Sequence, residues 1–105
     1  MLTVRLIMSH TKLTNPEIRK LKAEAQRLEP IVRVGKGGLT ATVVASIEQE
    51  LTLRELIKIR FSQERDERDE LAGKIAETTG AKLLMQVGKV AVFYRPKPAA
   101  DATAQ

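Results

Sequence analysis

The chain has 105 residues, of which 43% are hydrophobic and 30% charged, and its 18 basic residues outnumber 13 acidic ones to give a net charge of +5. This length and composition predict one soluble domain with a modest hydrophobic core. Because cysteine is absent, the sequence excludes disulfides and thiolate metal sites. No apolar run is long enough to span a bilayer, so we expect a cytoplasmic protein that does not bind membranes.

The two ends of the chain differ from its middle. Residues 1–8 have an apolar bias but are too short for a secretory signal, which needs an apolar core of roughly 7–15 residues and a cleavage site. Met8 is an alternative start to Met1. We expect a flexible extension over residues 1–11, a folded domain over residues 12–96 and a disordered tail over residues 97–105.

The first half of the domain predicts a helix, a strand and a second helix. Thr14 and Glu17 have the spacing of a capping box, and Pro30 ends the helix that they begin. A short strand follows over residues 31–34, and Thr40 suits the N-cap of the next helix. Apolar residues recur at helical spacing in both helices: Ile18, Leu21, Ala25 and Leu28 in the first, and Val43, Val44, Ile47 and Leu51 in the second.

The second half predicts a strand, a helix and a hairpin. The elements expected are a strand over Leu56–Phe61, a charged connection over residues 62–68, a helix over residues 69–79, and strands over Lys82–Val87 and Val90–Tyr94. Alternating apolar and polar residues are typical of a strand with one buried face, as in the first of these strands. Gly80 suits the end of the helix, and Gly88 with Lys89 favours a tight hairpin turn.

The element order α-β-α-β-α-β-β predicts a single compact α/β domain with a four-stranded mixed sheet and helices packed on it. The helices that follow the first two strands imply parallel crossovers, whereas the last two strands pair antiparallel. We expect the helices to cover one face of the sheet and the first helix to cover part of the second face.

The groups that catalysis needs are scarce in this sequence. The only histidine is His10, beside Ser9 in the N-terminal extension, and neither Ser46 nor Ser62 has a histidine nearby in the sequence. The carboxylates gather in the third helix, and a charge run of this density is typical of a solvated helix face. We therefore expect no catalytic residue, no metal ion or other cofactor, and no small-molecule substrate.

A glycine-rich link, Gly35-Lys36-Gly37-Gly38, joins the first strand to the second helix. Glycines let a backbone approach closely, and the start of a helix directs N–H groups toward an anion. The link lacks the spacing and the Lys-Ser/Thr pair of a Walker loop, but it matches the short GxxG clamp that holds a nucleic-acid backbone. A tight turn without a ligand is the alternative interpretation.

The positive charge is unevenly distributed along the chain. Residues 64–77 hold six acidic and three basic residues, so this segment carries −3 and the rest of the chain +8. Lys58 and Arg60 project from the face opposite the buried side chains of their strand, which is either an ordinary solvated face or part of a strip that neutralises phosphates. The residues predicted to bind RNA are Arg33, Gly35, Lys36, Gly37, Gly38, Lys58 and Arg60, followed by Arg19, Lys20 and Lys22 on the first helix.

Four groups of residues, in this order and spacing, resemble the CRM domain family. They are Leu13-Thr14 followed by Leu21, Ala25 and Leu28-Glu29-Pro30; Val34-Gly35-Lys36-Gly37-Gly38-Leu39-Thr40; Glu55-Leu56-Ile57-Lys58-Ile59-Arg60; and Gly88 followed by Val92-Phe93-Tyr94-Arg95. The resemblance covers residues 12–96, and the chain is similar to the stand-alone bacterial members, the YhbY-like RNA-binding proteins. Arg54 departs from the pattern, since many members have histidine there.

The resemblance implies a fold similar to the C-terminal domain of translation initiation factor 3, with RNA bound by the GxxG loop and the basic surface beside it. It also implies an accessory role in assembly of the large ribosomal subunit, with ribosomal RNA of its precursors as the partner. We expect a monomer. One alternative is an interaction module that binds a ribosomal protein or assembly factor through the acidic third helix. Another is a DNA-binding domain, although no helix is rich in base-reading side chains.

Overall fold

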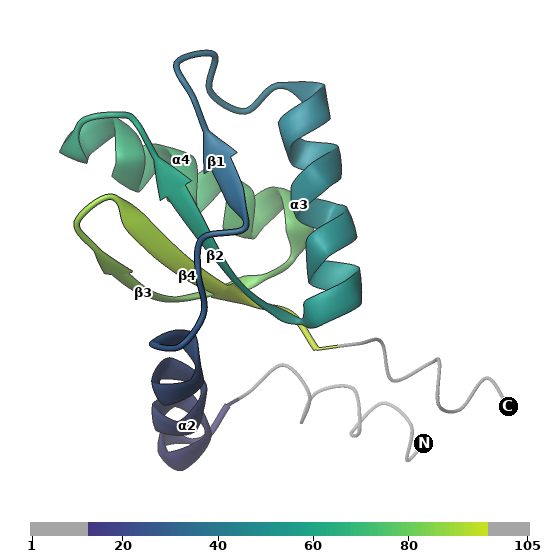
Figure 1. The fold of residues 1–105 in the computed structure, drawn as a ribbon, viewed down its shortest axis with the longest axis vertical. Helices are drawn as coiled ribbons and strands as arrows, with labels where there is room; N and C mark the ends of the chain where they lie inside the picture. Colours follow the sequence, from purple (N-terminus) through teal and green to yellow (C-terminus); the bar gives the residue numbers. More distant parts are fainter. Residues whose placement is uncertain (1–12, 97–105) are drawn as a thin grey trace, which may run out of the picture.

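The computed structural model describes residues 13–96, so the expectations for residues 1–11 and 97–105 lie outside it. The described chain forms three helices and four strands, drawn in Figure 1. They are α2 (Asn15–Ala25), β1 (Val32–Val34), α3 (Ala41–Arg54), β2 (Leu56–Phe61), α4 (Arg65–Thr79), β3 (Lys82–Val87) and β4 (Val90–Tyr94). This order confirms the predicted α/β class.

The four strands form one mixed sheet in the order β1-β2-β4-β3. β1 and β2 are parallel neighbours, and α3 forms the crossover that connects the end of β1 to the start of β2. β4 pairs antiparallel with both β2 and β3. The predicted parallel crossover and C-terminal hairpin are thus confirmed. Helix α4 connects β2 to β3, and β4 lies between these two strands in the sheet.

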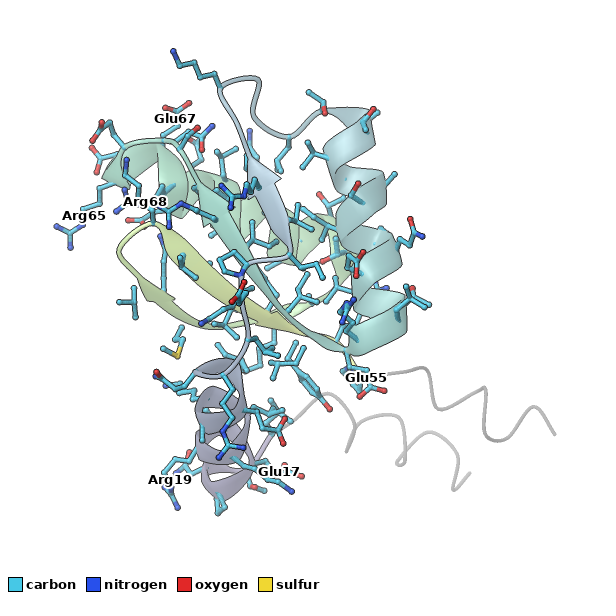
Figure 2. All side chains as sticks on the ribbon, viewed as in Figure 1. Glu17, Arg19, Glu55, Arg65, Glu67 and Arg68 are labelled. Atoms are coloured by element: carbon cyan, nitrogen blue, oxygen red, sulfur yellow. The ribbon has the colours of Figure 1, made fainter. Side chains whose placement is uncertain are left out.

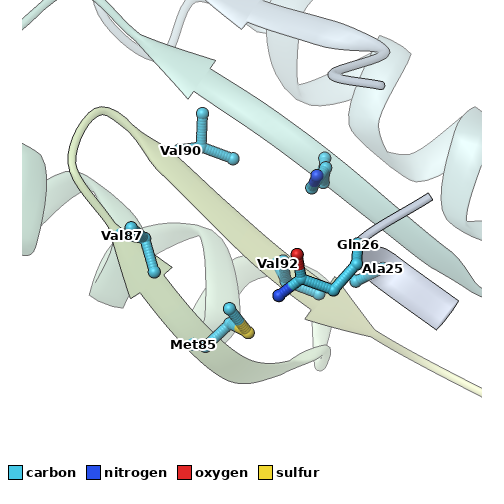
Figure 3. Close-up of a pocket in the computed structure, with 7 residues that line it drawn as sticks. Ala25, Gln26, Met85, Val87, Val90 and Val92 are labelled. Atoms are coloured by element: carbon cyan, nitrogen blue, oxygen red, sulfur yellow. The ribbon is translucent and has the colours of Figure 1, made fainter. Parts of the chain in front are cut away.

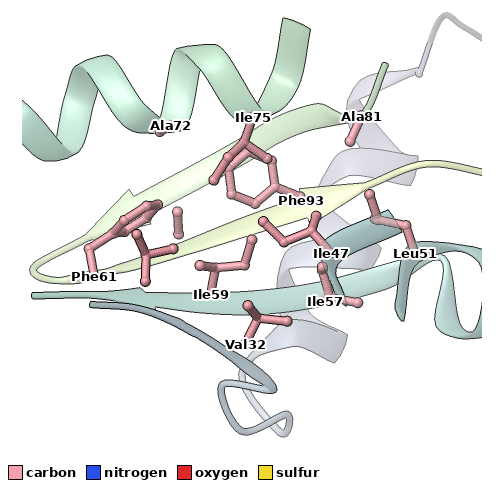
Figure 4. Close-up of a cluster of buried hydrophobic side chains, with 12 residues drawn as sticks. Val32, Ile47, Leu51, Ile57, Ile59, Phe61, Ala72, Ile75, Ala81 and Phe93 are labelled. Atoms are coloured by element: carbon pink, nitrogen blue, oxygen red, sulfur yellow. The ribbon is translucent and has the colours of Figure 1, made fainter. Parts of the chain in front are cut away.

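The main hydrophobic core lies between one face of the sheet and helices α3 and α4 (Figure 4). Ile57, Ile59 and Phe61 of β2 are each no more than 1% exposed, which confirms the period-two pattern of that strand. The helices contribute Ile47, Leu51, Ala72 and Ile75. Burial of one such large apolar side chain stabilises the fold by roughly 1.5–3 kcal/mol, so this layer fixes which face of each strand points inward.

Helix α2 packs on the opposite face of the sheet, as predicted for the first helix. Its capping box is formed, because Thr14 and Glu17 each accept a hydrogen bond from the other's backbone N–H. Ala25 is buried against Leu56 of β2 and Val92 of β4. α2 therefore covers one end of this face and leaves the other end of the face exposed.

Helix α4 begins at Arg65, earlier than predicted, so most of the expected charged connection over residues 62–68 is helical. Asp66 and Glu67 lie in its first turn, where the positive end of the helix dipole stabilises acidic side chains. The first turn of α4 was not predicted from the run of charged residues, because arginine and glutamate are good helix formers as well as common loop residues.

Helix α2 ends at Ala25, well before Pro30, where the helix was expected to stop. A turn follows, in which the N–H of Leu28 donates to the carbonyl oxygen of Ala25 at 3.0 Å. Leu28 is 38% exposed, so it does not belong to the buried face predicted for it. The next strand also starts one residue later than predicted, at Val32.

Candidate nucleic-acid interface

The glycine loop, residues 35–38, lies at the end of the domain opposite α2 (Figure 1). Val34, the last residue of β1, is 1% exposed and anchors the loop in the core. By contrast, Gly35, Lys36 and Gly37 are exposed. The chain thus leaves the core at the end of β1, turns in solvent and returns to begin α3.

Two internal hydrogen bonds close the loop. The N–H of Gly38 donates to the carbonyl oxygen of Gly35, and the N–H of Thr40 donates to the carbonyl oxygen of Gly38, both at 3.0 Å. The hydroxyl of Thr40 then caps α3 by accepting from the N–H of Val43 at 3.2 Å, as predicted. One of the loop amides is therefore used by the fold itself.

The amides of Lys36 and Gly37 differ from that of Gly38. Within residues 13–96, neither N–H has a hydrogen-bond partner. Both precede the first turn of α3, whose own N–H groups carry partial positive charge. Together with the ammonium of Lys36, they form an exposed set of donors suited to a phosphate oxygen.

Only one loop glycine is required by the backbone conformation. Gly38 has a φ of +73°, in the left-handed region that side chains disfavour. A Cβ on Gly35 would meet nothing within 4 Å, and one on Gly37 would meet only Cγ2 of Thr40 at 3.6 Å. The fold can accept a side chain at these two positions, where it would project into space open to a ligand.

The base of the loop is fixed from the segment that leads into α4. Gln63, only 7% exposed, donates from Nε2 to the carbonyl oxygen of Gly35 at 2.6 Å. The N–H and hydroxyl of Ser62 both donate to the carbonyl oxygen of Val34, at 3.1 and 3.2 Å. The sequence did not predict a role for Gln63, because residues 62–68 were interpreted as a charged connection. One uncharged amide among charged residues was the available signal.

Arg33 and Arg60 lie side by side on the sheet face that α2 leaves open. They are register partners on the parallel strands β1 and β2, and both are exposed. In the part of the chain that the structure describes, no carboxylate oxygen lies within 4.0 Å of either guanidinium or of Lys36. The structure therefore places two of the predicted arginines next to each other without an acidic partner. Arg33 lies one residue before the end of β1, which leads into the glycine loop.

Lys58 shares this face but has another contact. Its Nζ donates to the carbonyl oxygen of Leu28 at 2.9 Å, just beyond the end of α2. A lysine is well placed there, because the last carbonyls of a helix and its following turn attract cations. The structure thus gives Lys58 a role in holding α2 against the sheet.

The predicted residues of the first helix lie apart from the loop. Arg19 and Lys20 are exposed and Lys22 is half-buried, all on α2. Figure 2 shows Arg19 at the far end of α2, away from the link between β1 and α3. The structure therefore divides the predicted RNA-binding residues into a loop-side group and a separate group on α2.

The acidic helix α4 lies on the other side of the sheet from Arg33 and Arg60, since its Ala72 and Ile75 pack in the main core. Figure 2 labels Glu67 at the beginning of this helix. The unequal distribution of charge along the sequence thus becomes a difference between two faces of the domain. Such polarity is typical of proteins that bind a polyanion on one side.

Neither a metal site nor a membrane-spanning helix is found among residues 13–96. No group of three or more histidine, cysteine, aspartate or glutamate side chains is arranged to hold a metal ion there. None of the described helices is long and apolar enough to cross a membrane.

Comparison with known families gives a clear assignment. The profile of the CRS1/YhbY (CRM) domain matches residues 13–95. The chain belongs to this family. The resemblance seen in the sequence motifs is therefore confirmed, and the glycine loop of this CRM domain falls within the matched region.

Relatives of this CRM domain cover most of its length. A protein of Pseudomonas aeruginosa, named a probable RNA-binding protein, is 33% identical over 87 residues, which is 82% of this chain and 84% of the relative. A protein of Haemophilus influenzae, named an RNA-binding protein, is 34% identical over 87 residues, covering 82% of this chain and 88% of the relative.

A solved structure shares the fold of this CRM domain. The solution structure of a hypothetical protein from Staphylococcus aureus, described as a candidate RNA-binding protein, matches with a TM-score of 0.72 at 33% identity. The match covers 83% of this chain and 92% of the other.

The last motif of this CRM domain has a structural role. Arg95 forms a 2.8 Å ion pair with Glu48 of α3 and donates to the carbonyl oxygen of Thr79 at the end of α4, also at 2.8 Å. It also donates to the hydroxyl of Thr52 at 3.2 Å. Arg95 thus joins both helices of the main core to the end of β4.

Proposed function

We propose that this CRM domain is a non-catalytic RNA-binding protein that contacts the RNA backbone through its glycine loop and the Arg33–Arg60 pair. The observation that carries the proposal is the exposed loop, in which the amides of Lys36 and Gly37 have no partner within residues 13–96. Family membership and the names of the relatives point to the same ligand.

The loop supplies close contact with one phosphate. Because Gly37 has no side chain, the backbone of an RNA strand can approach the two amides directly. The ammonium of Lys36 then pairs with the phosphate charge. Arg33 and Arg60 extend the positive surface along the sheet, where each guanidinium can form paired hydrogen bonds with a phosphate. Such contacts orient the strand and do not read its sequence.

The proposed RNA contact surface contains fewer residues than were predicted from the sequence. Lys58 contributes positive potential to the same face, but its ammonium is bonded to Leu28. Arg19, Lys20 and Lys22 form a separate basic surface on α2, so we assign them no part in the contact with the loop-bound phosphate.

We further propose an accessory role in assembly of the large ribosomal subunit, with ribosomal RNA of its precursors as the ligand. This proposal rests on the resemblance to the stand-alone bacterial members of the family. Contacts with the phosphate backbone, such as those proposed for the loop and the two arginines, suit a folded RNA that is recognised by its shape and backbone.

The salt dependence of RNA binding tests the loop contact. Loss of one phosphate contact should make the slope of log affinity against log salt shallower by about 0.7–0.9. We expect this change for Lys36→Ala with a structured RNA. Lys74→Ala is the matched control, because Lys74 is an exposed lysine on α4, on the other side of the sheet. An unchanged slope and affinity for Lys36→Ala would exclude the ammonium of Lys36 from the RNA site.

A protein partner is the second candidate function. Asp66, Glu67 and Glu70 are exposed on α4 and present an acidic surface to a basic protein. Association with ribosomal particles that survives complete digestion of RNA would favour this function. Association that is lost on digestion, and competed by structured RNA better than by duplex DNA, would favour RNA binding.

A further inference from the structure

The open part of the α2-side sheet face has a basic half and an apolar half. Arg33 on β1 is level with Arg60 on β2, Arg60 with Val90 on β4, and Val90 with Val87 on β3. One row across the sheet therefore changes from two guanidinium groups to two valines. In the next row toward α2, Lys58 is level with Val92.

The apolar half is hollowed into a groove of about 250 Å³, which we call the sheet groove (Figure 3). Its lining residues are Ala25, Gln26, Lys58, Met85, Val87, Val90 and Val92. Val92 is 2% exposed and belongs to the floor, whereas Val87 is 64% exposed at the hairpin end. The end of α2 closes the groove at the other side, and Figure 3 shows Gln26 there beside Val92.

We infer that the sheet groove receives one unstacked nucleobase of an RNA strand whose phosphates lie on Arg33 and Arg60. The inference rests on the proposed function and adds a base contact to it. Adjacent rows of a sheet lie roughly 6.6 Å apart, and neighbouring strands about 4.8 Å apart. A base attached to a phosphate at Arg60 is therefore near enough to reach Val90 and Val92.

The chemistry of the sheet groove suits a nucleobase. Its apolar floor can cover the flat face of a base, and the side-chain amide of Gln26 can both donate to and accept from polar atoms at the edge of the base. Single-stranded RNA presents such bases once they leave the stack. The two arginines without carboxylate partners select an occupant linked to negative charge, which an apolar peptide would not supply.

The aromatic residues do not take part. Phe61 and Phe93 are at most 1% exposed in the main core, and Tyr94 is half-buried beside α2. The base would instead contact valine methyl groups and the thioether of Met85. We therefore expect a modest contribution to affinity, below that of a base stacked on an aromatic side chain.

Removal of the bases provides a direct test. The full chain is titrated with a fluorescently labelled octauridylate and with an abasic ribose-phosphate strand of the same length. We expect the abasic strand to bind about fivefold more weakly, which corresponds to roughly 1 kcal/mol of apolar contact. The methyl resonances of Val87, Val90 and Val92 should shift with octauridylate but not with the abasic strand.

Variants assign the effect to the sheet groove. Val87→Ser should weaken octauridylate binding and leave abasic binding unchanged, whereas Lys36→Ala should weaken both strands equally. Leu53→Ser is the matched control, since Leu53 is 62% exposed on α3 and far from the groove in the fold. Unfolding curves confirm that each variant is folded.

The outcomes separate this inference from the proposed function. Equal, salt-dependent binding of both strands would overturn the base site and leave backbone binding intact. RNA binding without any response of the groove methyl groups would also overturn it and leave that face to a protein partner. Failure to bind either strand and any structured RNA would overturn both proposals.

Discussion

The side chain of Gln63 donates a 2.6 Å hydrogen bond to the carbonyl oxygen of Gly35 and so links the segment before α4 to the first glycine of the loop. Gln63 is 7% exposed, so water cannot easily replace this bond. The loop therefore has a fixed base and an exposed tip. A loop held in this way loses little conformational entropy when a ligand binds.

Gln63→Ala should affect both stability and binding. We expect the free energy of unfolding to fall by about 1 kcal/mol, because the part-buried hydrogen bond from Gln63 to the carbonyl oxygen of Gly35 is lost. RNA affinity should fall as the loop loosens, while the salt slope stays unchanged because no cation is removed. Urea denaturation and fluorescence anisotropy measure the two effects.

Gln86→Ala is the matched control for Gln63. Gln86 donates from its amide to Asp69 of α4 at 2.9 Å, but at an exposed site away from the loop. We expect only a small loss of stability and no change in RNA affinity. If Gln63→Ala binds RNA as well as the wild type, the fixed base of the loop is irrelevant to binding.

Lys58 and Arg60 should respond differently to the same substitution. Lys58→Met is expected to lower the free energy of unfolding by about 1 kcal/mol, because the carbonyl of Leu28 loses a charged donor at a partly hydrated site. Arg60→Met should leave stability nearly unchanged and make the salt slope of RNA binding shallower by about 0.7–0.9. The opposite pattern would assign the phosphate contact to Lys58.

The contrast between these two residues shows what could be predicted from sequence. Alternation along β2 placed Lys58 and Arg60 on the same face correctly, since side-chain direction in a strand is a local property. The bond from Lys58 to Leu28 was not predictable, because it depends on where α2 docks on the sheet. The same docking separates Arg19 on α2 from the loop.

Element type was predicted better than element boundaries. The cap at Thr40 and the buried stripe of α3 were predicted because both depend on residues close in sequence. The start of α4 at Arg65 and the end of α2 at Ala25 were predicted wrongly. A run of charged residues is compatible with a helix as well as a loop, and the residues before Pro30 are compatible with a turn as well as the last turn of a helix.

Alanine substitutions should separate the two kinds of glycine in the loop. Gly38→Ala is expected to lower the free energy of unfolding by about 1 kcal/mol, because its φ of +73° disfavours a side chain. Gly37→Ala should leave stability unchanged within about 0.5 kcal/mol, since its Cβ would make only an ordinary contact with Thr40.

RNA affinity then tests the purpose of Gly37. We expect Gly37→Ala to weaken RNA binding although the domain stays as stable as the wild type, because the new methyl group blocks the approach of a phosphate to the exposed amides. Unfolding and anisotropy measurements on the same preparations provide the comparison. Full RNA affinity in this variant would show that the strand does not approach the loop backbone closely.

The single tyrosine reports the environment under α2. Burial raises the pKa of Tyr94 above its usual 10.0, and the carboxylates of Glu55, Glu17 and Glu24 raise it further. Figure 2 shows Glu17 on α2 and Glu55 at the end of α3. Because the chain has no tryptophan, ultraviolet absorbance of the phenolate follows this one group. We expect a titration midpoint above pH 10 in the folded protein.

The raised pKa of Tyr94 also predicts how stability changes in alkali. Above pH 10 the unfolded chain loses the phenolic proton while the folded protein keeps it, so the free energy of unfolding falls as pH rises toward the folded pKa. The stabilising contribution of the protonated Tyr94 is fully present below pH 10.

Lysines titrate in the same pH range, so Tyr94→Phe is the control. The free energy of unfolding of this variant should fall less steeply above pH 10 than that of the wild type. Glu55→Gln should lower the midpoint of Tyr94. Parallel stability curves for wild type and Tyr94→Phe, or a midpoint at or below 10, would contradict the burial of this side chain beside α2.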